Sequence, residues 1–424
     1  MSGYIVGLDI GSSKICASLG KCDRQGELQI LGITSVSCNG LKKGIVVDID
    51  STTEAVKNCI EKLERMADIQ IKSVYISIPG GICDLIKSTG VIAISSEDRE
   101  IKSNDIERVH KAARVIAISS DKQIIGIIPE QYTVDGYTNV KDPLGMSGIR
   151  LEVEAKIIVA QTTVIENLCK SVNKAGLNID GIVLQSTAIS KVVLKNEEKR
   201  MGTAIVDAGA ETIDISIYKD ENLVYTTMIP IGGSSITNDI AICLKVPYSI
   251  AEELKTKHYH TLQKHLAAKS DIKVFDSYNH EISVDSRMLY EVIEARVEEL
   301  LFLIKKELVK SGFYEDIAGI VMVGGGLSMF DDICQLGMKN INKPIRLGTP
   351  DFSGAESPIY ASVCGIVKDK AHGIKNFNLE HEKKLQSNSM SANEAVFDGY
   401  DDEDEDEKQV GILTKIKDFF TDFF

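Results

Sequence analysis

The chain has 424 residues with a formal net charge of −14, and 43% of its residues are hydrophobic and 26% charged. These fractions are typical of a soluble globular protein with more than one domain, and the lack of a basic stripe argues against a nucleic-acid partner. Nine cysteines without a Cys-x-x-Cys pair favour reduced thiols over disulfides or zinc, no signal-peptide pattern is present, and no apolar run approaches the roughly 20 residues of a membrane-spanning helix.

The N-terminal segment 4–19 has the pattern of a strand, a tight turn and a second strand. An apolar run leads to Asp9, Gly11 allows the turn, and alternating apolar residues follow. Main-chain N–H groups at a glycine turn can approach an anion, and an aspartate at a strand end can hold a hydrated magnesium ion. An ordinary β-hairpin with an Asx turn is the simpler interpretation of one such loop alone. The candidate phosphate-binding residues are Gly11, Ser12, Ser13 and Lys14.

The next segments complete a first domain. Strands are predicted at 28–33, 44–48 and 73–78. Between the second and the third, Ser51 and Glu54 fit a capping box at the start of a helix with one apolar face. The sequence Pro-Gly-Gly at 79–81 then ends the last strand, and we expect the chain to leave the first domain there.

Segment 82–160 has a different pattern, with short strands at 91–94, 124–128 and 151–158 around one helix. This pattern predicts a small α+β subdomain inserted into the first domain. Two segments within it are rich in turn residues, 128–136 (IPEQYTVDG) and 142–152 (DPLGMSGIRLE), and neither contains a catalytic constellation.

A helix with a capping box at Thr163 and Glu166 returns the chain to the first domain, and strand 179–184 ends at Gln185. A glutamine amide can orient a water molecule but cannot accept a proton at physiological pH, so any hydrolysis that depends on Gln185 should be slow. A helix-capping role for this side chain is an equally good interpretation.

Segment 203–218 repeats the pattern of the N-terminus. An apolar run reaches Asp207, Gly209 allows a turn, and an alternating strand follows. Two loops of one pattern indicate a duplicated domain whose copies close on one ligand. The second set of candidate phosphate-binding residues is Gly209, Ala210, Glu211 and Thr212.

The second half continues with strand 223–229 and a helix that begins at Ser234 after Gly232 and Gly233, whose N-terminal amides would add to the phosphate site. Ser249 and Glu252 fit another capping box, with Lys255 one turn later on the same face as Glu252. A long helix is predicted over 286–311, and its charged residues would by default be solvated. Strand 320–323 precedes a glycine turn at Gly324, Gly325 and Gly326.

The C-terminal part divides in two. Segment 371–410 is polar, lacks periodicity and contains eight acidic residues between 398 and 407, which predicts a disordered acidic linker. Segment 411–424 predicts an amphipathic helix that is too short to span a bilayer and that folds on a membrane interface. Docking on the protein body or on a partner is the alternative. The apolar face consists of Ile412, Leu413, Ile416, Phe419, Phe420, Phe423 and Phe424.

The paired loops and the glycine turn, in this order, resemble the nucleotide site of the actin, Hsp70 and sugar-kinase superfamily. Segments 128–136 and 142–152 are similar to the matching segments of the FtsA family of bacterial cell-division proteins, and the resemblance covers residues 4 to about 367. It implies an α/β fold, an actin-like two-domain ATPase with an FtsA-type inserted subdomain.

The resemblance also implies roles for the candidate residues. ATP with Mg²⁺ would lie between the halves, its phosphates on the two loops, with Asp9 and Asp207 holding waters of the metal. Glu252 and Lys255 match a motif that lines the adenosine pocket, and Gly324 to Gly326 would pack under the adenosine. At Gln185, FtsA relatives usually carry Glu-Pro, whereas actins carry a glutamine that orients the attacking water.

The resemblance also implies a domain organisation. We expect a first actin-like domain at 1–81 and 161–202, with the inserted subdomain at 82–160 between them, and a second actin-like domain at 203–232 and 313–370, with a small subdomain at 233–312. The linker and the membrane helix would follow at 371–410 and 411–424.

The resemblance implies a polymer on the cytoplasmic face of the cell membrane at the division site, which anchors FtsZ filaments and helps to recruit other division proteins. The C-terminal peptide of FtsZ would bind the small subdomain near Arg296 and Lys305. One alternative is a metabolic kinase with the same nucleotide site, but no convincing second pocket with a catalytic carboxylate is found. The other is a pilus-assembly actin homologue, which usually lacks the C-terminal helix.

Overall fold

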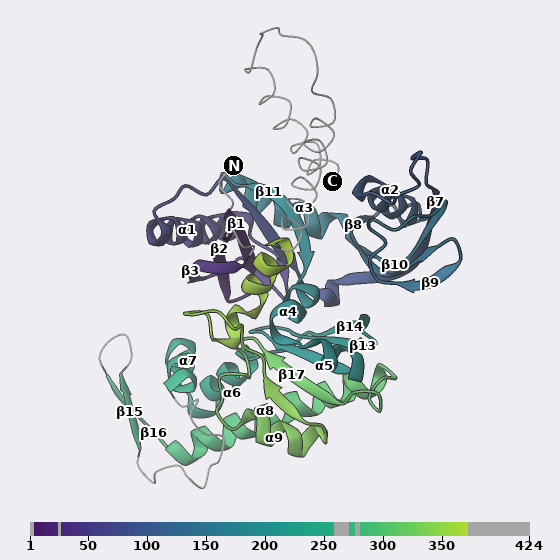
Figure 1. Cartoon of the computed structure of the whole chain (residues 1–424). Helices are drawn as coiled ribbons and strands as arrows, with labels where there is room; N and C mark the ends of the chain where they lie inside the picture. The colour runs from purple at the N-terminus through teal and green to yellow at the C-terminus, as the bar shows by residue number, and fades with distance from the viewer. Residues whose placement is uncertain (1–3, 24–26, 258–270, 276–279, 372–424) are drawn as a thin grey trace.

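The computed structural model describes residues 4–23, 27–257, 271–275 and 280–371 (Figure 1). Segment 411–424 and all but the first residue of segment 371–410 lie outside these ranges. The described residues form three sheets of four or five strands, two small two-stranded sheets, and the helices around them. None of the described helices is both long and apolar enough to cross a membrane.

The first sheet consists of an antiparallel meander extended by two parallel strands. Its strand order is β11-β6-β1-β2-β3. Helices α1 and α3 pack against it, with Val56 and Val172 in the shared core. The bounds are β1 Tyr4–Ile10, β2 Lys14–Cys22, β3 Leu28–Ser37, α1 Ile49–Ala67, β6 Ser73–Ile78, α3 Thr162–Lys174 and β11 Asn178–Leu184.

The second large sheet has the order β14-β13-β12-β17-β18 and repeats this topology. In both sheets three antiparallel strands follow one another, and two later strands extend the first of them in parallel. The duplication predicted from the twin loops is therefore present in the fold. The strands are β12 Thr203–Ala208, β13 Ile213–Lys219, β14 Asn222–Ile229, β17 Gly319–Val323 and β18 Ile345–Leu347.

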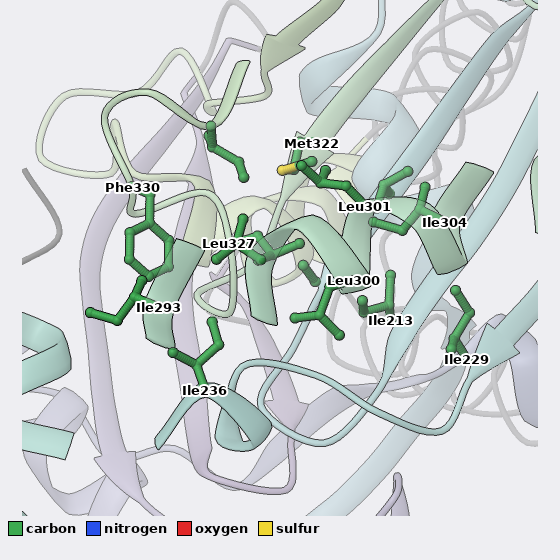
Figure 2. Close-up of a cluster of buried hydrophobic side chains, with 14 of the residues drawn as sticks. Ile213, Ile229, Ile236, Ile293, Leu300, Leu301, Ile304, Met322, Leu327 and Phe330 are labelled. Atoms are coloured by element: carbon green, nitrogen blue, oxygen red, sulfur yellow. The ribbon is translucent and has the colours of Figure 1, made fainter. Parts of the chain in front are cut away.

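Helix α8 supplies one side of the core of the second half. Its apolar stripe predicted a helix over 286–311, which agrees with the structure to within one residue. Side chains of this helix, among them Leu300 and Ile304, meet Ile213 of β13 and Met322 of β17 in one core (Figure 2). Burying each of these large apolar side chains contributes about 1.5–3 kcal/mol. The helices of this half are α6 Ser234–Leu244, α7 Tyr248–Lys257, α8 Ser286–Lys310 and α9 Ile333–Ile341.

The inserted segment forms a separate lobe beside the two halves (Figure 1). Its sheet has the order β7-β10-β8-β9, and α2 covers one face with Val109 and Ala113. The bounds are β7 Cys83–Ala93, α2 Ser103–Ala113, β8 Lys122–Val134, β9 Tyr137–Val140 and β10 Arg150–Gln161.

Shorter elements join the three sheets. A buried cluster that includes Ile78, Ile158, Ile205 and Val321 brings all three together. The remaining bounds are β4 Leu41–Lys42, β5 Ile45–Val46, η1 Gly80–Ile82, α4 Gln185–Val193, α5 Asn196–Met201, β15 Ile272–Phe275, β16 Glu281–Val284 and η3 Pro358–Tyr360, which continues as a helix over 361–371.

The predicted capping boxes are wrong. Helix α1 is capped by Asp48, whose carboxylate accepts from the Ser51 main-chain N–H at 3.0 Å. Helix α3 begins at Thr162 without a side-chain cap, and α7 begins at Tyr248, which places Ser249 inside the helix. In each case the helix begins earlier than the motif, so the serine or threonine is not at the N-cap position.

Candidate functional site

The first loop is a tight turn between β1 and β2. The Gly11 N–H donates to the Lys14 carbonyl at 3.0 Å. A Cβ atom at Gly11 would lie 3.0 Å from that carbonyl, so glycine suits the turn sterically. Asp9 lies just before the turn, opposite Cys16.

The second loop repeats this geometry. The Gly209 N–H donates to the Thr212 carbonyl at 2.8 Å, as Gly11 does to Lys14. The carbonyl oxygens of Gly209 and Ala210 accept from the N–H groups of Gly233 and Ser234 at 3.0 and 2.8 Å. These two amides at the start of α6 therefore bind the second loop. They were predicted to be free donors for phosphate, as is usual at a helix N-terminus, but both already have a carbonyl partner.

The glycine turn packs directly on the second loop. The Gly326 N–H donates to the Ala208 carbonyl at 2.6 Å, and a Cβ atom at Gly326 would lie 2.2 Å from the Gly209 carbonyl oxygen. At Gly324 a Cβ atom would lie 2.3 Å from Asp207 Oδ1, and a Cβ atom at Gly232 would lie 2.5 Å from the Gly209 carbonyl oxygen. These glycines are needed for close contact within the protein.

Gly325 has a different environment. A Cβ atom there would lie 3.2 Å from the Lys14 ammonium nitrogen and 3.3 Å from Ile359 Cγ2. Lys14 belongs to the first loop, whereas Gly325 belongs to the second half. The structure therefore brings the first loop, the second loop and the glycine turn together.

Three carboxylates lie at this junction, and the third was missed in the sequence. Asp214 is directly opposite Asp207 in the pairing of β12 with β13, so both side chains point to the same face of the sheet. Burial, together with the negative charges of Asp214 and Asp9, raises the pKa of Asp207 to about 8. Burial likewise raises the pKa of Asp214 to about 6. An aspartate in the apolar strand 213–217 was the signal that could have identified it.

Asp9 has polar neighbours from two other elements. Burial raises its pKa, while the Ser77 hydroxyl, which donates to Asp9 Oδ1, opposes this shift. Gln185 Nε2 also donates to Asp9 Oδ1, at 3.4 Å, from the first residue of α4. No side chain caps α4. Gln185 therefore lies among the carboxylates and does not cap the helix.

When ionised, the three carboxylates would form a region of negative charge that a cation would stabilise. Among the described residues, no group of three or more His, Cys, Asp or Glu side chains is close enough to hold a metal directly. Carboxylate oxygens suit Mg²⁺, which usually keeps several of its waters. The donor set therefore fits a magnesium ion held through water.

The buried carboxylates predict a pH-dependent stability. A folded-state pKa of Asp207 raised from 3.8 to about 8 means that the metal-free protein loses stability as pH rises through this window. The variant Asp207→Asn removes this charge. We expect its thermal midpoint at pH 8 in EDTA to exceed that of the unmodified protein by roughly 2 °C or more, with a difference that shrinks toward pH 5.

Thermal unfolding at several pH values measures this difference. The control is Glu97→Gln, which removes an exposed carboxylate and should leave the midpoint unchanged. A destabilised Asp207→Asn protein at pH 8 would contradict the prediction.

The turn between β4 and β5 contacts both loops. The Gly44 N–H donates to Ser12 Oγ at 3.2 Å, and the Lys43 N–H donates to Glu211 Oε2 at 2.7 Å. Lys43 adopts a left-handed conformation, with φ 49°. Ser12 and Glu211, predicted to contact phosphate, are therefore bridged by one turn of the first half.

Glu252 and Lys255 form a network behind the second loop. The Lys255 ammonium group donates to Glu252 Oε2 and Thr237 Oγ1, both at 2.7 Å, and to the Gly233 carbonyl at 3.4 Å. Lys255 is 5% exposed, and burial lowers its pKa. Lys255 thus stabilises the start of α6, while the Glu252 side chain remains 43% exposed.

Arg296 and Lys305 lie on α8, where both have partners within the chain. Arg296 pairs with Asp239 of α6 and with Glu299. Lys305 donates to the Asn340 carbonyl at the end of α9 at 3.1 Å. An acidic peptide would have to compete with these contacts. The predicted membrane residues from Ile412 to Phe424 lie outside the described part of the chain.

Solved structures share this fold at low sequence identity. The chain aligns with a PilM–PilN type IV pilus biogenesis complex at a TM-score of 0.57, covering 86% of this chain and 97% of the other. MreB5 of Spiroplasma citri bound to ADP aligns at 0.53, covering 88% and 98%. Both are 15% identical to this chain, so they show the fold alone.

Closer relatives are found in sequence. The chain is 35% identical over 423 residues to the cell division protein FtsA of Pseudomonas aeruginosa, covering 97% of this chain and 96% of the relative. It is 33% identical over 438 residues to FtsA of Enterococcus faecalis, covering 100% and 99%. Residues 80–159 match the family model of the SHS2 domain inserted in FTSA, and residues 204–365 match that of the cell division protein FtsA. The chain therefore belongs to the FtsA family of cell division proteins.

Proposed function

We propose that this protein binds ATP with Mg²⁺ between its two halves and acts in cell division as an actin-like polymer on the cytoplasmic face of the membrane. The observation that carries the nucleotide part is the meeting of two loops, which share the same turn hydrogen bond, with Lys14 and three carboxylates. A polyphosphate with its metal matches this pattern, because a lysine attracts phosphate and carboxylates attract the cation.

The side chains then have distinct roles. Lys14 would neutralise phosphate charge beside Gly325. Asp9, Asp207 and Asp214 would hold the waters of the metal, and bound Mg²⁺ would screen the phosphate charges. The Glu252 carboxylate, partly exposed beside α6, is placed to meet the nucleoside.

The chemistry of the Gln185 side chain argues against rapid ATP hydrolysis. Its amide is beside Asp9 and can orient a water molecule, but it cannot remove the proton of that water. Hydrolysis would be slow at most. Bound nucleotide would then act chiefly by holding the two halves together and so controlling the state of the polymer.

The family membership supports the cellular part of the proposal. The protein would anchor FtsZ filaments at the division site, with its C-terminal segment 411–424 on the lipid interface, and help to recruit other division proteins. The FtsZ C-terminal peptide would approach α8 near Arg296 and Lys305, displacing Asp239 or Glu299 from Arg296.

Equilibrium binding of ATP to the full chain tests the nucleotide site. We expect saturable binding that Mg²⁺ strengthens and EDTA weakens, because uncompensated carboxylates repel the phosphates. Binding that is indifferent to Mg²⁺ would contradict the role of the three aspartates, and the lack of saturable binding would contradict the site as a whole.

A further inference from the structure

The inserted subdomain is covalently attached to the first half but is also bonded to the second. The chain enters it from β6 through η1 and leaves it from β10 into α3. On β10, the Lys156 ammonium group donates a hydrogen bond to the Leu223 carbonyl oxygen of β14, which belongs to the sheet of the second half. The subdomain therefore lies at a joint that both halves share.

The Lys156 contact is a buried one. The side chain is 7% exposed, and its ammonium nitrogen lies 2.6 Å from Glu130 Oε1 on β8. A buried ammonium ion requires nearby acceptors, because transfer of an unpaired charge out of water is strongly unfavourable. Here one acceptor comes from the subdomain and the other from β14. Separating the two surfaces would remove the second acceptor from the charge.

The position of Leu223 favours this contact. The pairing of β13 with β14 shifts register between Ile217 and Tyr218, where Tyr218 pairs with Leu223. A β-bulge of this kind disturbs the local ladder and changes the direction of main-chain groups. The irregularity thus occurs at Leu223, whose carbonyl oxygen accepts the hydrogen bond from Lys156.

The entry of the subdomain is bonded to the same hairpin. The Gly81 N–H donates to Asp214 Oδ1 on β13 at 3.1 Å. Cβ atoms at Gly80 and Gly81 would lie 2.3 Å from Thr226 Oγ1 and 2.0 Å from Met228 Cβ on β14. The main chain of η1 therefore lies against β14 and touches a carboxylate of the candidate nucleotide site.

We propose that Lys156 clamps the inserted subdomain to the β13–β14 hairpin, so that the subdomain follows the second half and its position is coupled to nucleotide binding beside Asp214. The nucleotide part of this inference rests on the proposed function. If the second half shifts relative to the first on binding, the clamped subdomain shifts with it. The segment that joins the subdomain to the first half, η1, contains the two glycines that allow its main chain to lie against β14.

The variants separate the clamp from charge effects. Lys156→Met retains the length of the side chain but removes the ammonium group and leaves Glu130 without this partner. The double variant Lys156→Met/Glu130→Gln removes both charges, so it tests the contact without an unpaired carboxylate. Lys141→Met is the matched control, because Lys141 also pairs across this interface, with Glu221 at 3.0 Å, but is 63% exposed.

Hydrogen exchange of the full-length protein without nucleotide tests the clamp itself. We expect the amides around 156 and 223 to exchange about tenfold faster or more in both Lys156 variants, and to be unchanged in Lys141→Met. Unchanged exchange in the double variant would overturn the clamp. Faster exchange throughout the chain of both variants would also overturn it, since Lys156 would then support global stability.

Exchange with ATP and Mg²⁺ tests the coupling. In the unmodified protein, saturating ATP should change protection within 83–160, and this change should be lost in the double variant although that variant still binds ATP. An unmodified protein that binds ATP without any change in 83–160 overturns the coupling alone. An unmodified protein that does not bind ATP overturns the proposed function and the coupling together, while the exchange without nucleotide still reports on the clamp.

Discussion

Gly325→Asp is expected to weaken ATP binding by at least about 100-fold, which corresponds to roughly 2.7 kcal/mol. The new side chain would project toward the Lys14 ammonium group, 3.2 Å from the position of the added Cβ atom. The carboxylate would pair with Lys14 and add a fourth negative charge to a site that already contains Asp9, Asp207 and Asp214. Equilibrium binding of ATP with Mg²⁺ measures the loss.

Two controls separate charge from steric effects. Gly325→Ala adds the Cβ atom without the charge and should cost much less affinity. Ser353→Asp introduces the same charge at an exposed turn position and should leave binding unchanged. Asp207→Ala should also abolish binding by removing a carboxylate that would hold a water of the metal. Retained affinity in both Gly325→Asp and Asp207→Ala would contradict the site assignment.

The parts of the fold that follow from local pattern were predictable from the sequence. The predicted bounds of strand 73–78 and helix 286–311 agree with the structure to within one residue. Both could be predicted because the spacing of apolar residues indicates which face of an element is buried. The twin loops indicated a duplication, which the matching strand orders of the two sheets confirm.

The parts that depend on tertiary contacts were not predictable. Asp214 was missed because its role arises from strand register, which places it opposite Asp207. Glu252 was interpreted as a helix cap that also lines the adenosine pocket. In the structure it accepts from Thr237 of α6 and from Lys255 of its own helix. Lys156 carried no signal at all, since its acceptor lies 67 residues away in the chain. Such pairings are set by how the sheets pack, and local sequence does not encode that packing.

Deleting the residues after Gln409 is expected to abolish sedimentation of the protein with liposomes. The deleted segment carries seven large apolar residues that an amphipathic helix would place on one face. Full burial of each contributes about 1.5–3 kcal/mol, although interfacial burial is partial and ordering the helix opposes binding. Co-sedimentation of the full and the shortened chains, each with and without ATP and Mg²⁺, measures this effect.

A single copy of such a helix should bind weakly, so ATP should increase sedimentation of the full chain if it promotes polymers that present many copies at once. Phe420→Asp in the full chain should reduce binding strongly, because it places a charge on the apolar face. Thr421→Asp would add the same charge to the opposite face of the predicted helix and is the matched control. Equal sedimentation of the full and shortened chains would show that segment 411–424 has another partner. Loss in Thr421→Asp as great as in Phe420→Asp would indicate charge repulsion from the lipid in place of insertion of an apolar face.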